Sequence, residues 1–306
     1  MGGRAFLFPG QGSQAVGMGA DLCAQFPEAR ELFAQADELL GFSLSQCCFE
    51  GPEEELRQTA ITQPALFVHS AAACRLLEAR GIYPSWVAGH SLGEYSALAA
   101  AGVLDFATGL ELVRRRGQLM QEQRQGSMAA VLGLEDGQVV ELCSQVPGVV
   151  AANFNAPGQV VISGEVEAVA RAGKLAEEAG AKRVVELPVS GAFHSPLMEP
   201  AARELAGLLQ AVEFRTPRVP VLTDVAAAPV SAPGQLQEHL IRQMTSPVRW
   251  TAIMQCLAGL GVESALEVGP GSVLRGLARR AAPHLKVAGA GTAEEIAAPV
   301  AAPGDG

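Results

Sequence analysis

The stretch WVAGHSLGEYSAL, residues 86–98, decides the fold and carries the clearest chemical signal in the chain. It opens with a short apolar run typical of a buried strand and ends in small residues that favour a helix. Between the two lies Gly-His-Ser-Leu-Gly, which places Ser91 on a sharp strand-to-helix turn. In that context the G-x-S-x-G pattern predicts a serine nucleophile, and the Leu92 N–H is placed to donate to an oxyanion. The pattern alone leaves open a plain alternative, a helix capped by serine in a glycine-rich turn.

Outward from this turn, apolar runs alternate with amphipathic segments. The expected strands cover residues 5–8, 86–88, 219–223 and 264–268. The expected helices cover residues 26–40, 64–79, 95–101, 106–122, 203–212 and 235–243. Strands that alternate with helices favour a parallel sheet with helices on its faces, so we expect an α/β-hydrolase-like large domain.

The middle of the chain follows a different pattern. Its expected elements, in order, are a strand at 128–132, a helix at 136–146, strands at 149–152 and 159–163, a helix at 166–179 and a strand at 183–189. This order matches a ferredoxin-like unit. We therefore expect a catalytic domain of residues 1–125 and 191–288, with a ferredoxin-like domain of residues 126–190 inserted in it. Residues 289–306 are rich in Ala, Gly and Pro, and we expect a loose C-terminal tail.

Composition narrows the function classes. The chain has 306 residues, of which 49% are hydrophobic and 18% charged, and its net charge is −10. It can bury a large core, and the acidic balance argues against nucleic acid as a partner. The apolar run at the N-terminus is too short for a signal peptide or a membrane span, so we expect a cytoplasmic protein without a membrane partner. The six cysteines form no C-x-x-C pair, which favours buried free thiols over disulfides or a metal site.

A serine nucleophile needs a base, and the position of His194 favours it among the five histidines. His194 lies in the loop GAFHSP just after an expected strand, where catalytic groups of α/β folds collect. His90 adjoins the serine and is expected to point elsewhere, His69 and His239 lie in helical patterns, and His284 lies near the C-terminal end.

An acid for the triad is missing from the expected interval. Asp105 and Asp136 are the only aspartates between Ser91 and His194. Asp105 follows the nucleophile helix closely, and Asp136 falls in the small domain. A backbone carbonyl that accepts from Nδ1 would hold the histidine tautomer instead.

Arg116 interrupts an otherwise apolar helix face. Spacing at about 100° per residue puts it near the middle of the apolar arc of helix 106–122, while Arg114 and Arg115 fall on the polar side. A buried guanidinium is costly unless it is paired. The residues leave two explanations open, a buried ion pair with an internal carboxylate or a fork that holds a substrate carboxylate.

Seven segments of the sequence, taken together, resemble those of a known family. They are FPGQGSQ (8–14), GHSLGEYSAL (89–98), RG-x-LM (116–120), NFNAPGQVVISG (153–164), GAFHSPLM (191–198), RQMTSPVRW (242–250) and EVGPG (267–271). Together and in this order they resemble the malonyl-CoA:acyl carrier protein transacylase family, whose relatives include acyltransferase domains of polyketide and fatty-acid synthases. The resemblance runs from residue 8 to about residue 277.

The resemblance implies a reaction and a role for each matching residue. A malonyl group would move from malonyl-CoA to the phosphopantetheine thiol of an acyl carrier protein. No metal and no cofactor would be needed, since the coenzyme A thioester is a substrate. The implied residues are Ser91 as nucleophile, His194 as base, the Gln243 carbonyl as its orienting group, the Gln11 and Leu92 amides as oxyanion hole, Arg116 on the malonyl carboxylate, and Asn153, Met120 and Phe193 in the acyl site. Phe193 in the GAFHS segment would narrow the site against an α-methyl group.

Several expectations depend on this assignment. The glycine-rich loop at 8–14 lacks a Walker lysine and the G-x-G-x-x-G spacing, so it is not expected to bind a nucleotide phosphate. A monomer is expected, and the expected contacts with an acidic carrier are Lys182, Arg183, Arg275, Arg279 and Arg280. A serine hydrolase and a non-catalytic component of a synthase are the alternatives. The hydrolase would leave Arg116 and the Gln243 segment unexplained, and the intact Ser91 and His194 argue against the non-catalytic component.

Overall fold

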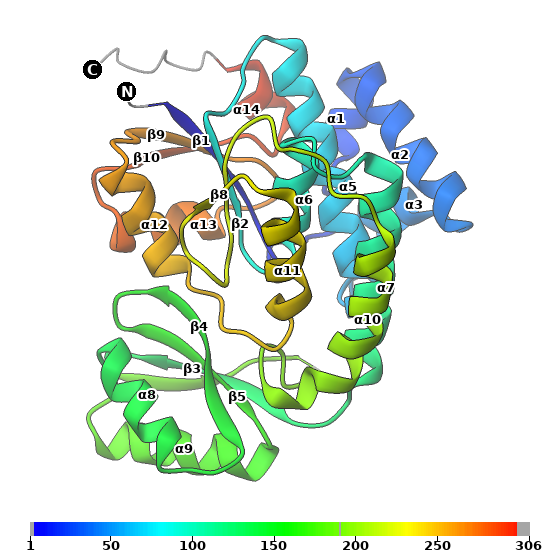
Figure 1. Cartoon of the computed structure of the whole chain (residues 1–306). Helices are drawn as coiled ribbons and strands as arrows, with labels where there is room; N and C mark the ends of the chain where they lie inside the picture. The colour runs from blue at the N-terminus through cyan, green and yellow to red at the C-terminus, as the bar shows by residue number, and fades with distance from the viewer. Residues whose placement is uncertain (1–2, 190, 299–306) are drawn as a thin grey trace.

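A computed structural model describes residues 3–189 and 191–298, which form two sheets in separate parts of the molecule (Figure 1). The larger sheet has the strand order β10-β9-β1-β2-β7-β8. Its strands are β1 (Arg4–Phe8), β2 (Trp86–Gly89), β7 (Val221–Leu222), β8 (Pro229–Val230), β9 (Ser264–Glu267) and β10 (Lys286–Gly289). All neighbours pair in parallel except β7 and β8. The predicted parallel sheet is therefore confirmed, with one antiparallel strand at its edge.

Helices cover both faces of this sheet. They are α1 (Ala20–Gln25), α2 (Pro27–Leu40), α3 (Leu44–Glu50), α4 (Glu53–Leu56), α5 (Thr59–Ala79), α6 (Gly93–Ala100), α7 (Phe106–Glu122), the 3₁₀ turn η1 (Pro196–Met198), α10 (Glu199–Ala211), α11 (Pro233–Gln243), α12 (Trp250–Gly259), α13 (Val273–Ala281) and α14 (Ala293–Ala297). Successive side chains of a strand point to opposite faces of the sheet, so β1 contributes residues to a hydrophobic core on each face. Phe6 and Phe8 belong to one buried cluster, and Ala5 and Leu7 belong to the other.

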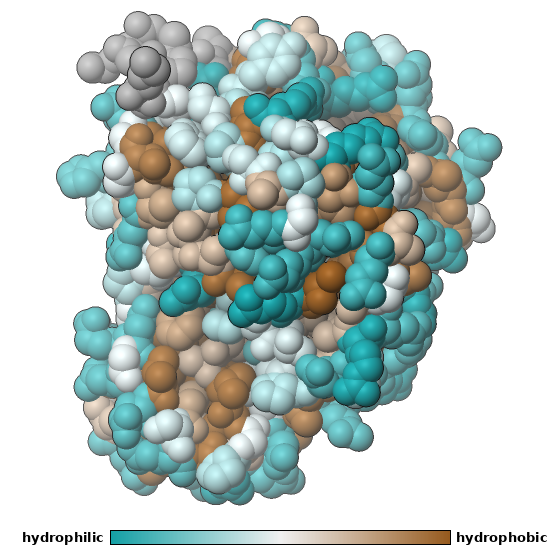
Figure 2. All heavy atoms as spheres, in the orientation of Figure 1, coloured by the Kyte–Doolittle hydropathy of each residue, from teal (hydrophilic) through white to brown (hydrophobic). Residues whose placement is uncertain are grey.

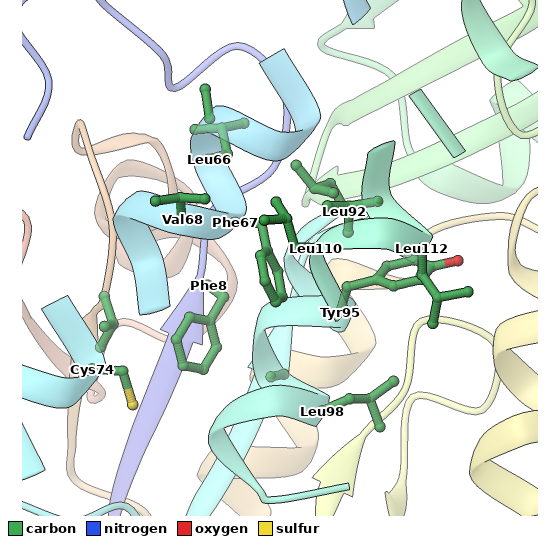
Figure 3. Close-up of a cluster of buried hydrophobic side chains, with 14 of the residues drawn as sticks. Phe8, Leu66, Phe67, Val68, Cys74, Leu92, Tyr95, Leu98, Leu110 and Leu112 are labelled. Carbon is green, nitrogen blue, oxygen red and sulfur yellow. The ribbon is translucent and has the colours of Figure 1, made fainter. Parts of the chain in front are cut away.

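The first of these clusters lies directly beneath the start of α6. Figure 3 shows Phe8 of β1 facing Phe67 of α5, with Tyr95 of α6 and Leu110 of α7 nearby. All four side chains are at most 1% exposed. This packing fixes α5, α6 and α7 against β1, and it thereby fixes the turn that carries Ser91 at the start of α6.

The second sheet is antiparallel and has the order β4-β5-β3-β6. Its strands are β3 (Ser127–Leu132), β4 (Val149–Ala156), β5 (Gln159–Gly164) and β6 (Arg183–Glu186), and its helices are α8 (Asp136–Ser144) and α9 (Val166–Glu178). The two helices cover one face and share a core of their own with the sheet. The order strand, helix, strand, strand, helix, strand with this pairing is the predicted ferredoxin-like topology.

Several expectations about the course of the chain need correction. The strand expected at 149–152 extends to Ala156, the helix expected at 203–212 begins at Glu199, and the strand expected at 219–223 covers only Val221 and Leu222. The tail expected from residue 289 is not loose at its start, because α14 buries Ala293 and Ile296 against the large core, and residues 299–306 lie outside the described residues. The strand expected at 183–189 ends at Glu186, since only residues 183–186 pair with β3. Helix α5 begins at Thr59, five residues before the expected start, and includes Pro64.

The face of the molecule in Figure 2 is mixed, with hydrophilic residues across the middle of the view, where α11 lies. Among the described residues no helix is long and apolar enough to cross a membrane. All six cysteines are free thiols as predicted. Five of them are buried and Cys256 is half-buried.

Candidate active site

The strand-to-helix turn holds Ser91 in a backbone conformation that non-glycine residues rarely adopt. Its φ is +52°, in the left-handed region. The flanking glycines are required by contact: a Cβ on Gly89 would lie 1.9 Å from the Gly93 backbone, and a Cβ on Gly93 would lie 2.1 Å from the carbonyl oxygen of Phe8. The turn therefore packs backbone against backbone, which lifts the serine hydroxyl away from the sheet.

His194 lies within hydrogen-bond reach of that hydroxyl. Its Nε2 is 2.8 Å from Ser91 Oγ, and its Nδ1 is 3.1 Å from the carbonyl oxygen of Gln243 and 3.0 Å from that of Ser246. Two carbonyl acceptors at Nδ1 fix the tautomer with the proton on that nitrogen, which leaves Nε2 to accept the serine proton. His194 is 4% exposed, and burial, followed by the positive charge of Arg116, lowers its pKa to about 3. The imidazole is thus neutral near pH 7.

Arg116 points inward, as its helix position predicted, and is 1% exposed. Its Nη1 donates to Gln63 Oε1 at 2.9 Å, and its Nη2 donates to Ser91 Oγ at 3.0 Å and to Gln243 Oε1 at 3.1 Å. Its Cζ lies 5.6 Å from the centre of the Tyr95 ring. Within the part of the chain that the structure describes, Arg116 forms no ion pair with a carboxylate. Of the two explanations for its burial, the geometry favours the fork that holds a substrate carboxylate.

A cavity of about 160 Å³ joins these groups. Its lining comprises Gln11, His90, Ser91, Leu92, Arg116, Met120, Met128, Asn153, Asn155, Val161, Leu187, Val189, Phe193 and His194. All the predicted site residues except Gln243 line it, and Gln243 lies directly behind Ser91 and Arg116. A larger cavity of about 540 Å³ shares Gln11 and Val189 with it, so the two spaces adjoin.

The predicted oxyanion donors lie on this cavity. Leu92 begins the turn into α6, and Gln11 follows β1. In the described residues neither of the two backbone N–H groups donates to a protein acceptor, so both stay available to a ligand. The Ser91 N–H is different, because it donates to Asp224 Oδ2 at 2.9 Å.

The walls of the cavity come from both sheets. Phe193 and Met120 belong to the large sheet's side and are 6% and 2% exposed, while Asn153 belongs to β4 and is 7% exposed. His90 also lines the cavity, but its ring contacts the Trp250 ring and not the Ser91 hydroxyl. Its Nε2 lies 2.8 Å from Oδ1 of Asn155, which is also on β4.

Sequence reasoning missed two carboxyl groups beneath the turn. Glu94 and Asp224 are both fully buried, and both contact the Gln243 side chain. A signal for Asp224 was present, because it directly follows the strand expected at 219–223. Residues at strand ends of a parallel sheet are the ones that gather at a site, and the same rule had selected His194. Glu94 is the one charged residue of α6 and is buried among small side chains.

The five basic residues proposed for carrier contact are placed differently from one another. Arg275 forms ion pairs with Glu267 and Glu295, and Arg280 donates to Gln159 and to the Pro157 carbonyl. These two therefore have partners within the protein. Lys182, Arg183 and Arg279 form no ion pair within residues 3–189 and 191–298. Contact with a carrier stays a prediction for all five.

Comparisons with known proteins give one consistent picture. A family model described as "Acyl transferase domain" matches residues 5–297. The malonyl CoA-acyl carrier protein transacylase of Escherichia coli strain K12 is 47% identical over 283 residues, which cover 90% of this chain and 92% of that protein.

Two solved structures are similar to this chain over nearly its whole length. The acyl carrier protein S-malonyltransferase of Vibrio cholerae is 46% identical with a TM-score of 0.93, covering 95% of this chain and 98% of that one. A malonyl-transacylase solved in complex with its type II polyketide synthase acyl-carrier protein is 44% identical with a TM-score of 0.93, covering 95% and 97%.

Proposed function

The chain belongs to the malonyl-CoA:acyl carrier protein transacylase family and transfers malonyl groups from malonyl-CoA to acyl carrier protein; from that premise we propose that Ser91 carries the group as an ester. We propose that the reaction serves fatty-acid or polyketide biosynthesis, and the similar malonyl-transacylase solved with a type II polyketide synthase carrier supports the second role. The observation that carries the proposal is the 2.8 Å contact between Ser91 Oγ and His194 Nε2 inside a cavity that also holds Arg116.

In the first half-reaction the neutral His194 accepts the Ser91 proton as Oγ attacks the malonyl thioester carbon. The Gln11 and Leu92 amides donate to the oxyanion of the tetrahedral intermediate. His194 then returns the proton to the sulfur as coenzyme A leaves. The carbonyl groups of Gln243 and Ser246 hold the imidazole throughout and take the place of a triad acid.

In the second half-reaction the phosphopantetheine thiol of the carrier attacks the ester. His194 accepts the thiol proton and gives it to Ser91 Oγ, so the enzyme returns to its starting state in a ping-pong cycle. Arg116 holds the free carboxylate of the malonyl group through both steps. We propose that Asn153 and Asn155 face the acyl group from β4, and that Met120 and Phe193 limit its width.

An intact-mass experiment tests the proposal. Incubation with malonyl-CoA should add one malonyl group to the wild-type chain, and a carrier with its phosphopantetheine arm should then remove it and gain the same mass. The Ser91→Ala variant should show no adduct. An adduct on Ser91→Ala would point to another nucleophile. Release of free malonate without transfer would favour a hydrolase, and no adduct on the wild type would favour a non-catalytic component.

Three further expectations belong to the same proposal. We propose that the protein acts as a monomer and in the cytoplasm, where its two substrates would both be dissolved. We also propose that residues 126–190 are a separate domain inserted between residues 1–125 and 191–288. The separate hydrophobic core of the second sheet supports that division. Sedimentation at micromolar concentrations checks the oligomeric state, and a dimer there would overturn the monomer.

A further inference from the structure

The proposed reaction leaves one buried cluster unused, the two carboxyl groups of Glu94 and Asp224. They come from different elements, the first turn of α6 and the segment after β7, and both are 0% exposed. Both accept from the same atom, Gln243 Nε2, at 3.0 and 3.1 Å, and the Asp224 N–H donates to Glu94 Oε2 at 3.0 Å, so the two carboxyl groups are immediate neighbours. Two ionised carboxylates at such a distance without water repel strongly, so one of them must be compensated or protonated.

The donors around the pair can be counted. Asp224 Oδ2 accepts from the Ser91 N–H at 2.9 Å and from Gln243 Nε2 at 3.1 Å. Glu94 Oε2 accepts from the Asp224 N–H at 3.0 Å and from Gln243 Nε2 at 3.0 Å. Among the described residues, the second oxygens, Glu94 Oε1 and Asp224 Oδ1, have no donor. A proton on one carboxyl group, shared with the other, would supply the missing donor.

Glu267 shows what a buried carboxylate looks like when its donors are complete. Its Oε1 accepts from the Leu274 N–H at 2.9 Å and its Oε2 from the Arg275 N–H at 3.0 Å, at the start of α13, and the Arg275 side chain lies beside it. Burial raises the pKa of Glu267, as it does for Glu94 and Asp224, but every oxygen of Glu267 faces an N–H group. The pair differs from Glu267 in geometry, because it lacks two donors.

We propose that Glu94 and Asp224 act as a positioning pair that shares one proton and carries a single negative charge at neutral pH. Asp224 accepts from the Ser91 N–H, and the two hydrogens of Gln243 Nε2 are shared among Glu94, Asp224 and the Ser91 carbonyl, which lies 2.8 Å away, so the pair fixes the nucleophile turn. The same Gln243 supplies the carbonyl that orients His194. One residue therefore links the pair to both reacting groups, because the Gln243 side chain contacts the Ser91 turn and its backbone carbonyl contacts His194.

The charge of the pair also affects the substrate. The titratable or charged groups that face it are Arg116 from α7 and Tyr95 from α6. With one shared proton the pair balances the single charge of Arg116 before substrate binds. A doubly ionised pair would leave this buried group of residues with a net negative charge and oppose the malonyl carboxylate. Because the ionised form of each carboxyl is disfavoured by burial, the second proton should leave only above the ordinary range of a carboxylic acid.

Isosteric amides provide the kinetic test, with single-turnover malonylation of Ser91 as the measurement. In Asp224→Asn or Glu94→Gln the new amide N–H replaces the shared proton, and the amide oxygen still accepts from the Ser91 or Asp224 N–H. Each amide variant should keep most of the wild-type rate. Asp224→Ala removes the acceptor of the Ser91 N–H and should slow malonylation by about 10²-fold, the cost of a misplaced reacting group. Amide variants as slow as Asp224→Ala, or an alanine variant as fast as wild type, would overturn the proposal.

Infrared difference spectra of the wild-type chain against each variant test the shared proton directly. A purely structural role of the pair would not predict a protonated carboxyl band. The wild-type chain at neutral pH should show the carbonyl band of a protonated carboxyl group, and that band should vanish in both Asp224→Asn and Glu94→Gln. It should persist in Glu267→Gln, the matched control. A wild-type spectrum without the band, or a band that survives both amide variants, would refute the shared proton even if Asp224→Ala does not fold.

The inference about the pair rests on the proposed role of Ser91, and different measurements would refute each of the two proposals. If the wild-type chain formed no malonyl adduct, the nucleophile assignment would fall while the infrared band would still report on the pair. If the adduct formed and the band were absent, only the shared proton would be wrong.

Discussion

The two sheets line the same cavity with different kinds of residue, reacting groups on one side and non-reacting side chains on the other. The large sheet's side supplies the groups that react, Ser91, His194 and Arg116, while the small sheet supplies Met128, Val161 and the two asparagines of β4. Only three non-glycine residues in the described chain have a positive φ, and two of them are Ser91 at +52° and His194 at +57°. Strained backbone is therefore concentrated on the reacting side, where the large hydrophobic core beneath the Ser91 turn stabilises it.

One short segment connects the two walls. The carbonyl groups of Gln243 and Ser246 accept from His194, and two residues later Val248 pairs with β4, donating to the Ala152 carbonyl at 2.9 Å and accepting from the Phe154 N–H at 2.8 Å. The acyl wall and the base are thus fixed to the same stretch of backbone. The comparison predicts that changes on the large sheet's side alter the chemical step, while changes in the wall alter the choice of acyl group.

The largest effect is expected for His194→Ala. Without the base, malonylation of Ser91 should slow by about 10²–10⁴-fold, while the fold and the binding of malonyl-CoA persist. Single-turnover intact mass measures the rate. Val161→Ala, a change of similar type in the opposite wall, is the control and should leave the rate close to wild type. If the two variants slowed the reaction equally, the division between a reacting side and a passive wall would be wrong.

Arg116→Ala should affect malonyl transfer and acetyl transfer differently. Loss of a charge-assisted contact costs about 1.5–3 kcal/mol, so malonyl transfer should fall about 10–100-fold. Acetyl transfer should be kept or improved, since acetyl has no carboxylate to hold. The ratio of kcat/KM for malonyl-CoA and acetyl-CoA measures the effect.

Arg115→Ala is the matched control for this change. Arg115 is the preceding residue of α7, and its guanidinium pairs with Glu204 at the surface. Its removal should leave the ratio unchanged. An equal loss of both acyl donors in Arg116→Ala would mean that Arg116 does not hold the malonyl carboxylate.

The sequence predicted the reacting side better than the network behind it. Ser91, His194 and Arg116 each gave a local signal, namely a turn motif, a loop after a strand and an odd position on a helix face. Asp224 gave the same strand-end signal as His194 but was overlooked, while Glu94 and Gln63 gave none, because their roles depend on contacts across 53 to 149 residues of sequence. The end of the chain was mispredicted for a related reason. The segment after residue 289 reads as loop by composition, yet Ile296 finds a buried site in the large core.

Phe193→Ala tests the choice of acyl group at the boundary of the two walls. Phe193 is 6% exposed and lines the cavity next to His194. Removing its ring should admit an α-methyl group and reduce discrimination between malonyl-CoA and methylmalonyl-CoA by about tenfold, within the range of about 1–3 kcal/mol expected for one methyl. The ratio of the two kcat/KM values is the measurement. A ratio that stays at the wild-type value would show that another residue sets this limit.

The smallest effect is expected in the pH dependence of Arg116→Gln. Burial is the first cause that lowers the pKa of His194 to about 3, and the positive charge of Arg116 is the second. Protonation of His194 removes its ability to accept the Ser91 proton, so an acid limb in kcat/KM for acetyl-CoA follows that pKa. In the wild type the profile should stay flat between about pH 5 and 8, because the imidazole is neutral throughout that range.

In Arg116→Gln the positive charge is gone while the burial remains. The His194 pKa should therefore rise but stay below its ordinary value of 6.5, and the acid limb should begin at a higher pH than in the wild type. The shift in the His194 pKa should not alter rates above pH 7, where the imidazole is neutral in both proteins. Arg115→Gln should keep the wild-type profile, since its charge lies at the surface. A limb that does not move, or that moves to lower pH, would show that the field of Arg116 does not reach the base and that the reacting side is less tightly coupled than its hydrogen bonds indicate.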